Sequence, residues 1–156
     1  TMSEVDRKDW IRALSVHDED VIRTLVAGIA AEWTIRHKQV PKAGLGLLKM
    51  KDAAFNESYF IGEFPLASAW VEIETQGGER FEGGANILSR SHAFATDLAV
   101  CDAVLAHRPE GWRMVHEKML EGMNICQERE RVRKRILAKS KVDFSLLEQS
   151  EGEEHS

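Results

Sequence analysis

The sequence has few of the residues and runs that identify several common classes of protein. Its 156 residues include only two cysteines, and Cys101 and Cys126 are not spaced as a metal-binding pair. Two cysteines are also too few for a disulfide scaffold. No apolar run approaches the roughly 20 residues of a membrane helix, and the first residues lack the basic-then-apolar order of a signal peptide. We therefore expect two reduced thiols, no membrane segment and a cytoplasmic protein.

Positive charge is scarce as well. The chain has 21 Lys and Arg residues against 26 Asp and Glu residues, which gives a formal net charge of −5. General nucleic-acid binding depends on a strongly basic face, because the phosphate backbone dominates the affinity. We therefore expect no nucleic-acid partner.

The composition that remains is that of a globular protein. Hydrophobic residues make up 43% of the chain and charged residues 30%, which is too apolar for disorder throughout. A chain of this length forms one ordinary domain with its own core. We expect a single α+β domain over residues 3–147 and an acidic, disordered tail over residues 148–156.

Helical periodicity occurs at both ends of the chain. Apolar residues at helical spacing predict two N-terminal helices, one ending near Leu14 and one over residues 21–29. Residues 94–105 carry apolar side chains at steps of four, three and four, which predicts another helix. A long helical segment follows from Trp112, with Gly122 as the place for a bend.

The middle of the chain alternates between apolar and polar residues, which is typical of strands. The expected strands cover about residues 33–40, 48–51, 59–74 and 80–88. Gly77-Gly78 predicts a hairpin between the last two strands, and Gly83-Gly84 indicates a bulge or a close backbone approach. Short connections predict a four-stranded antiparallel sheet, a meander, with the C-terminal helices packed on one face.

Most catalytic motifs are missing. His116-Glu117 resembles the start of a zinc-protease motif, but the second histidine would have to replace Leu120. No serine lies in a Gly-x-Ser-x-Gly turn, and neither cysteine has a basic neighbour in the sequence. We expect no metal, no cofactor and no built-in nucleophile.

One segment is a candidate anion site. Arg90, Ser91 and His92 lie where the last strand passes into a helix, so free backbone N–H groups, the helix dipole and an arginine could together bind an anion. The structural alternative is that Ser91 caps the helix and Arg90 pairs with a surface acid.

The C-terminal part is a candidate interaction surface. Residues 128–141 carry seven basic and two acidic side chains, which form either a solvated face or a site for an acidic partner. Phe144, Leu146 and Leu147 are apolar although they lie near the end of the chain. They either fold back onto the domain or bind a neighbour, and we predict a partner-binding role.

Six short motifs occur in a fixed order along most of the chain. They are Arg7-Lys8-Asp9-Trp10 with Leu14, Pro41-Lys42-Ala43-Gly44-Leu45, Phe60-Ile61-Gly62-Glu63, Arg90, Asp102-Ala103-Val104 and Lys141-Val142-Asp143-Phe144. Their order and spacing together resemble the PhnG family, the G subunit of the bacterial carbon–phosphorus lyase system.

Two departures make this chain similar to a divergent member of that family. Ala67-Ser68-Ala69 stands where the family carries Thr-Arg-Cys, and serines flank Arg90 where the family has Gly-Arg-Asp. The Gly-Glu pair at Gly62 and Glu63 is retained. Glu63 is therefore a candidate functional acid, although an exposed glutamate after a glycine turn explains it equally well.

The resemblance implies an accessory subunit that assembles with the H, I and J subunits and is non-catalytic alone. With them it would support the replacement of the nucleobase of a nucleoside triphosphate by a phosphonate, as in a ribose 1-methylphosphonate 5-triphosphate synthase. The product would be a ribose 1-phosphonate 5-triphosphate. The I subunit would supply the nucleosidase activity, and a separate iron–sulfur radical subunit would break the carbon–phosphorus bond.

Two other interpretations stay open. The chain could be a stand-alone binder of a phosphorylated metabolite at the Arg90 site. It could also be a homodimer or larger homo-oligomer that pairs through the faces that its relatives give to partners.

Overall fold

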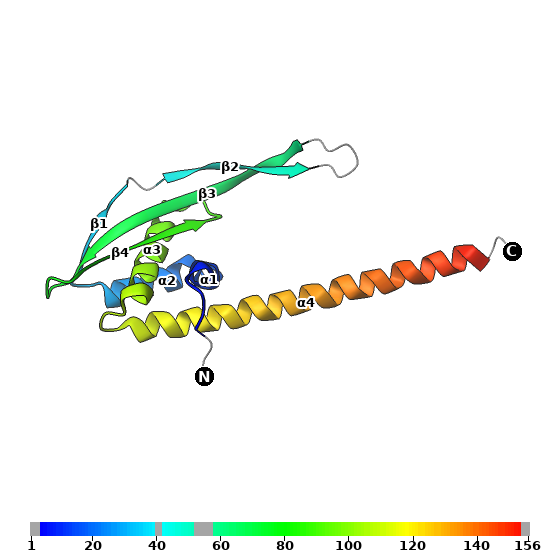
Figure 1. The fold of residues 1–156 in the computed structure, drawn as a ribbon. Coiled ribbons are helices and arrows are strands. Elements are labelled where there is room, and N and C mark those ends of the chain that lie inside the picture. Colours follow the sequence, from blue (N-terminus) through cyan, green and yellow to red (C-terminus); the bar gives the residue numbers. More distant parts are fainter. Residues whose placement is uncertain (1–3, 40–41, 52–57, 154–156) are drawn as a thin grey trace.

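The structure is a computed structural model that describes residues 4–39, 42–51 and 58–153, with side chains for residues 4–39 and 64–150. The elements run in the order α1 (Arg7–Leu14), α2 (Glu19–Ile29), β1 (Thr34–His37), β2 (Lys42–Lys51), β3 (Ser58–Glu74), β4 (Arg80–Ile87), α3 (His92–His107) and α4 (Trp112–Glu153). Figure 1 shows a sheet on one side of the body and helices on the other. No helix in the described ranges has the length and apolar content needed to cross a membrane.

The sheet is built around one long strand. Strand β3 pairs with β1 through its last residues and with β2 through its first residues, while β4 lies along its other edge. All three pairings are antiparallel, so the α+β class and the antiparallel sheet are confirmed. The expected number of four strands is confirmed, but the meander order was wrong, because β1 pairs with β3 and not with β2. Since β3 has 17 residues, β1 and β2 follow one another along the same edge. The sheet is three strands wide where β4 pairs with residues 67–74 of β3, and two strands wide along residues 58–66.

The hairpin between β3 and β4 forms where the Gly-Gly pair predicts it. Thr75 N–H donates to the Glu79 carbonyl at 2.9 Å, and Gly78 N–H donates to the Thr75 carbonyl at 3.0 Å. Gly78 has φ of 88°, a left-handed conformation that glycine adopts without steric cost.

Gly83 marks the point where α3 crosses the sheet. The β3–β4 register is continuous from Arg80 to Ile87, so the strand contains no bulge. A Cβ atom at Gly83 would overlap the Ala99 carbonyl and the Ala103 amide of α3. Of the two explanations of Gly83-Gly84, close backbone approach is therefore the correct one.

The core lies between the sheet and α3. Alternate residues of β3, including Val71 and Ile73, are buried, and α3 covers them with the predicted apolar face that contains Leu98 and Cys101. Helices α1, α2 and α4 then pack against α3 on the side away from the sheet.

Helix α4 corrects two expectations. Of the two C-terminal helices only α3 lies on the sheet, whereas α4 packs on α1 and α3 as a further layer. Gly122 does not interrupt α4, which is one continuous helix of 42 residues. Gly122 instead lets α4 approach α1, because a Cβ atom there would overlap the Ala13 carbonyl.

The second half of α4 leaves the body of the protein. We call residues 127–153 the free half, because every residue from Gln127 to Ser150 is exposed. In Figure 1 it extends away from the body, on the same side as the end of the β2–β3 hairpin. Helix α4 includes residues 148–153 of the expected acidic tail. Residues 154–156 lie outside the described residues.

Candidate functional site

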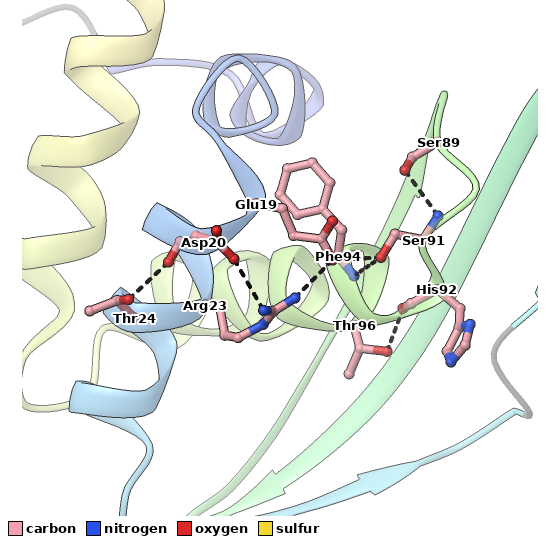
Figure 2. Close-up of polar contacts among 9 residues, drawn as sticks. All are labelled: Glu19, Asp20, Arg23, Thr24, Ser89, Ser91, His92, Phe94 and Thr96. Carbon is pink, nitrogen blue, oxygen red and sulfur yellow. Dashed lines mark hydrogen bonds and ion pairs between the residues drawn. The ribbon is translucent and has the colours of Figure 1, made fainter.

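The predicted anion site lies at the start of α3, where Ser91 is the N-cap residue (Figure 2). The Phe94 N–H donates to Ser91 Oγ at 3.1 Å, and the Ser91 N–H donates to Ser89 Oγ at 3.0 Å. The capping role that the sequence allowed for Ser91 is confirmed.

A carboxylate of the chain itself lies at this helix start. Ser91 Oγ–H donates to Glu19 Oε1 at 2.6 Å, and Arg23 binds the same oxygen at 3.1 Å (Figure 2). Burial raises the pKa of Asp97 on α3, with Arg23 lowering it and Glu19 raising it. The Ser91 hydroxyl is therefore already bonded to an acid of the chain itself.

The other two residues of the predicted site lie at the surface. Arg90 and His92 are exposed, and the His92 ring points away from the Ser91–Glu19 pair in Figure 2. Among the residues with described side chains, Arg90 forms no ion pair, so the expected pairing with a surface acid does not occur there. Anion binding at this helix start stays a prediction.

The other predicted site residues lie in β3 and in the free half of α4. The backbone of Glu63 lies in β3 opposite Leu47, and its side chain is outside the described part of the structure. Phe144, Leu146 and Leu147 lie in the free half of α4 and are 69%, 59% and 61% exposed. They do not fold back onto the body, because the helix carries them away from it.

An ion pair between α1 and the middle of α3 was missed by the sequence analysis. Arg7 Nε donates to Asp102 Oδ1 at 3.2 Å, and an Arg7 terminal nitrogen donates to Oδ2 at 2.8 Å. The Gly84 N–H donates to the same Oδ2 at 3.0 Å. The hydrogen bond to Asp102 raises the pKa of Arg7, so the guanidinium stays charged. One carboxylate thus links α1, α3 and the outer edge of β4.

The residues around Asp102 in the sequence could have indicated that it is a buried acid. It lies beside Cys101 in a helix whose other buried residues are apolar, and it is the only buried charged residue in the described part of the core. An acid in such a position needs partners, because an unpaired buried charge is very costly. The pattern could not indicate that the partner would be Arg7, which is 95 residues away.

Two open grooves lie on either side of α1. One, of about 700 Å³, runs beside the ion pair and is lined by Arg7, Lys8 and Trp70 among others. The second, of about 760 Å³, lies between the N-terminal segment and α4. In the second groove the Arg108 guanidinium lies 4.8 Å from the centre of the Trp112 ring.

The described residues include no assembled nucleophile. Burial raises the pKa of the Cys101 thiol to about 12, with Asp97 and Asp102 adding to the effect. A thiol protonated at neutral pH is a poor nucleophile. Cys101 is buried in the core, whereas Cys126 is partly exposed.

The comparison with protein families gives one match. The family model described as "Phosphonate metabolism protein PhnG" matches residues 5–149, and no curated protein matches the chain. The match spans the body and most of α4, and it includes both partners of the Arg7–Asp102 pair. The chain therefore belongs to the PhnG family of phosphonate metabolism proteins.

Proposed function

We propose that this protein is an accessory, non-catalytic subunit of a carbon–phosphorus lyase complex. It would assemble with subunits of the H, I and J types and support transfer of a phosphonate to the ribose C1 of a nucleoside triphosphate. Family membership supports the role in phosphonate metabolism. The finer role rests on one structural observation: more than half of α4 packs on nothing and carries exposed apolar side chains.

The exposed side chains argue for a partner on physical grounds. A helix in water gains most of its stability from packing an amphipathic face against something. Phe144, Leu146 and Leu147 gather near the end of the helix, and contiguous exposed apolar residues of this kind mark interaction sites. A subunit that contributes binding surface rather than reacting groups fits these features.

Co-expression of the tagged chain with the H-, I- and J-type subunits of its host tests this role. We expect stoichiometric recovery of the three subunits with the full chain. A chain that ends before Lys141 should lose them and keep its melting temperature, since those residues lie outside the core. A chain that lacks only residues 148–156 is the matched control, because it retains the three apolar side chains. Recovery of the full chain alone would contradict the proposal.

The alternative role, a stand-alone binder of a phosphorylated metabolite, has less support. Glu19 accepts the hydrogen bond of the Ser91 hydroxyl and would repel an anion there. The alternative requires that phosphate or ATP raise the melting temperature of the isolated chain and that Arg90→Ala abolish the shift. A Lys8→Ala variant serves as the control for unspecific loss of positive charge.

A further inference from the structure

The free half of α4 carries an apolar stripe that continues the buried face of the same helix. Steps of three or four residues lead from Val115 and Met119, which are buried, through Gly122 and Cys126 into the exposed part. The apolar members of the exposed stripe are Ile136, Leu137, Phe144 and Leu147. On this side of α4 the charged residues Arg129, Glu130 and Arg133 follow Cys126, and apolar side chains resume at Ile136.

The charge of the free half is divided into two blocks. Residues 128–141 have seven basic and two acidic side chains, whereas residues 142–156 have five acidic ones and no Lys or Arg. Within the first block Arg131 and Lys134 pair with the block's own acids, Glu128 and Glu130. The excess positive charge is thus left for another molecule, and the helix ends in an excess of negative charge.

We propose that a second copy of the chain covers this stripe, with the free halves of two α4 helices packed side by side in antiparallel orientation. In this arrangement the basic block of each copy lies against the acidic block of the other. A parallel pair would place like charges together, which is unfavourable. Antiparallel helices also bring the opposite ends of their dipoles together.

One apolar pair, Leu137 and Phe144, sets the register. If the two-fold axis passes between Ser140 and Lys141, Leu137 of each copy lies across from Phe144 of the other. The same register places Arg133 across from Glu148. Both residues are exposed in the single chain, and neither forms an ion pair among the described side chains. The interface is isologous, as in most symmetric dimers. This inference concerns the isolated chain and does not depend on the proposed function.

The test measures the mass of the purified full chain in solution by analytical ultracentrifugation over a dilution series. We expect a dimer for the unaltered chain. Arg133→Glu and Glu148→Arg should each yield monomers at concentrations where the unaltered chain is dimeric, because each places two like-charge contacts in the interface. An equimolar mixture of the two variants should restore the dimer, because every contact in the mixed pair is then between opposite charges. Far-UV circular dichroism shows whether each variant keeps its helix.

Disulfide trapping tests the orientation in a Cys126→Ser background. In the antiparallel register a Ser140→Cys substitution lies next to its copy and should cross-link. Arg133→Cys, on the same face, lies about 22 Å from its copy at 1.5 Å of rise per residue and should not.

Three results would overturn the proposal. One is that the chain is monomeric at every concentration, which would mean that a different subunit covers the stripe. Another is a dimer that both charge reversals leave unchanged. The third is cross-linking of Arg133→Cys as fast as that of Ser140→Cys, which would show a parallel pair.

Discussion

Arg7 and Asp102 form a bidentate ion pair between the first helix and the middle of the third, 95 positions apart in the sequence. The Asp102 side chain is 7% exposed and that of Arg7 is 58% exposed, so the guanidinium closes over a buried carboxylate from the solvent side. The Gly84 N–H of the edge strand donates the remaining hydrogen bond. The ion pair therefore adds a polar link between the N-terminal helix and the core to the packing of the buried Ala13 and Leu14.

Removal of Arg7 should destabilise the domain more than removal of its neighbour. Arg7→Ala leaves Asp102 buried without its cation, and we expect a loss of about 2–3 kcal/mol in the free energy of unfolding. Lys8→Ala is the matched control, because Lys8 pairs only with the exposed Asp6 and should cost less than about 0.5 kcal/mol. Urea denaturation measures both. Equal losses would mean that Asp102 needs no partner.

Gly122 and Gly28 should respond to alanine in opposite directions. Gly122→Ala places a methyl group on the Ala13 carbonyl and should cost about 1–3 kcal/mol, because α1 and α4 must move apart. Gly28 lies in α2 with no atom within 4 Å of an added Cβ, so Gly28→Ala should stabilise by about 0.5–1 kcal/mol. Thermal denaturation compares the pair. Stabilisation by both substitutions would show that α1 and α4 leave room for a methyl group between Gly122 and Ala13.

The two cysteines should differ in reactivity. Cys101 is buried with a pKa of about 12, whereas Cys126 is partly exposed at the start of the free half of α4. In titrations with a disulfide reagent at pH 8 we expect one thiol to react in the folded protein and two in urea. Cys126→Ser should remove the fast reaction. A second fast thiol in that variant would contradict the burial of Cys101.

Asp97→Asn should stabilise the protein at neutral pH and not in acid. Burial raises the pKa of Asp97 above its ordinary value of 3.8, so the folded state binds its proton more tightly than the unfolded state. Above the raised pKa, Asp97 is charged and lowers the free energy of unfolding. Below the ordinary pKa, Asp97 is protonated in the folded and the unfolded state, so this loss of stability disappears. The melting temperature of the variant should exceed that of the unaltered chain at pH 7, and the difference should vanish near pH 3. A constant difference over that range would assign the effect to something other than ionisation.

The sequence predicted the elements that rest on local patterns. The hairpin at Gly78, the buried face of α3 and the cap at Ser91 each follow from a few neighbouring residues. The order of the strands did not follow, because short connections fit a meander as well as two strands that share one edge of β3.

Long-range pairings were missed for a physical reason. Nothing near Ser91 in the sequence indicates that Glu19 will accept its hydrogen bond from a different helix. The role of Gly122 was misjudged similarly, since a glycine inside a helix favours a bend and a close crossing alike, and only the position of Ala13 decides between them.

Because α4 crosses α1 closely at Gly122 and Ala13, a small rotation at this crossing moves the far end of α4 over a larger distance. The helix extends 31 residues beyond Gly122, a length of about 46 Å at 1.5 Å per residue. A tilt of about 5° at the crossing would move the far end by about 4 Å, roughly the diameter of a methyl group, over that length. Any molecule that binds beside α1 and shifts it slightly would therefore displace the tip of α4 by enough to change what that tip can bind.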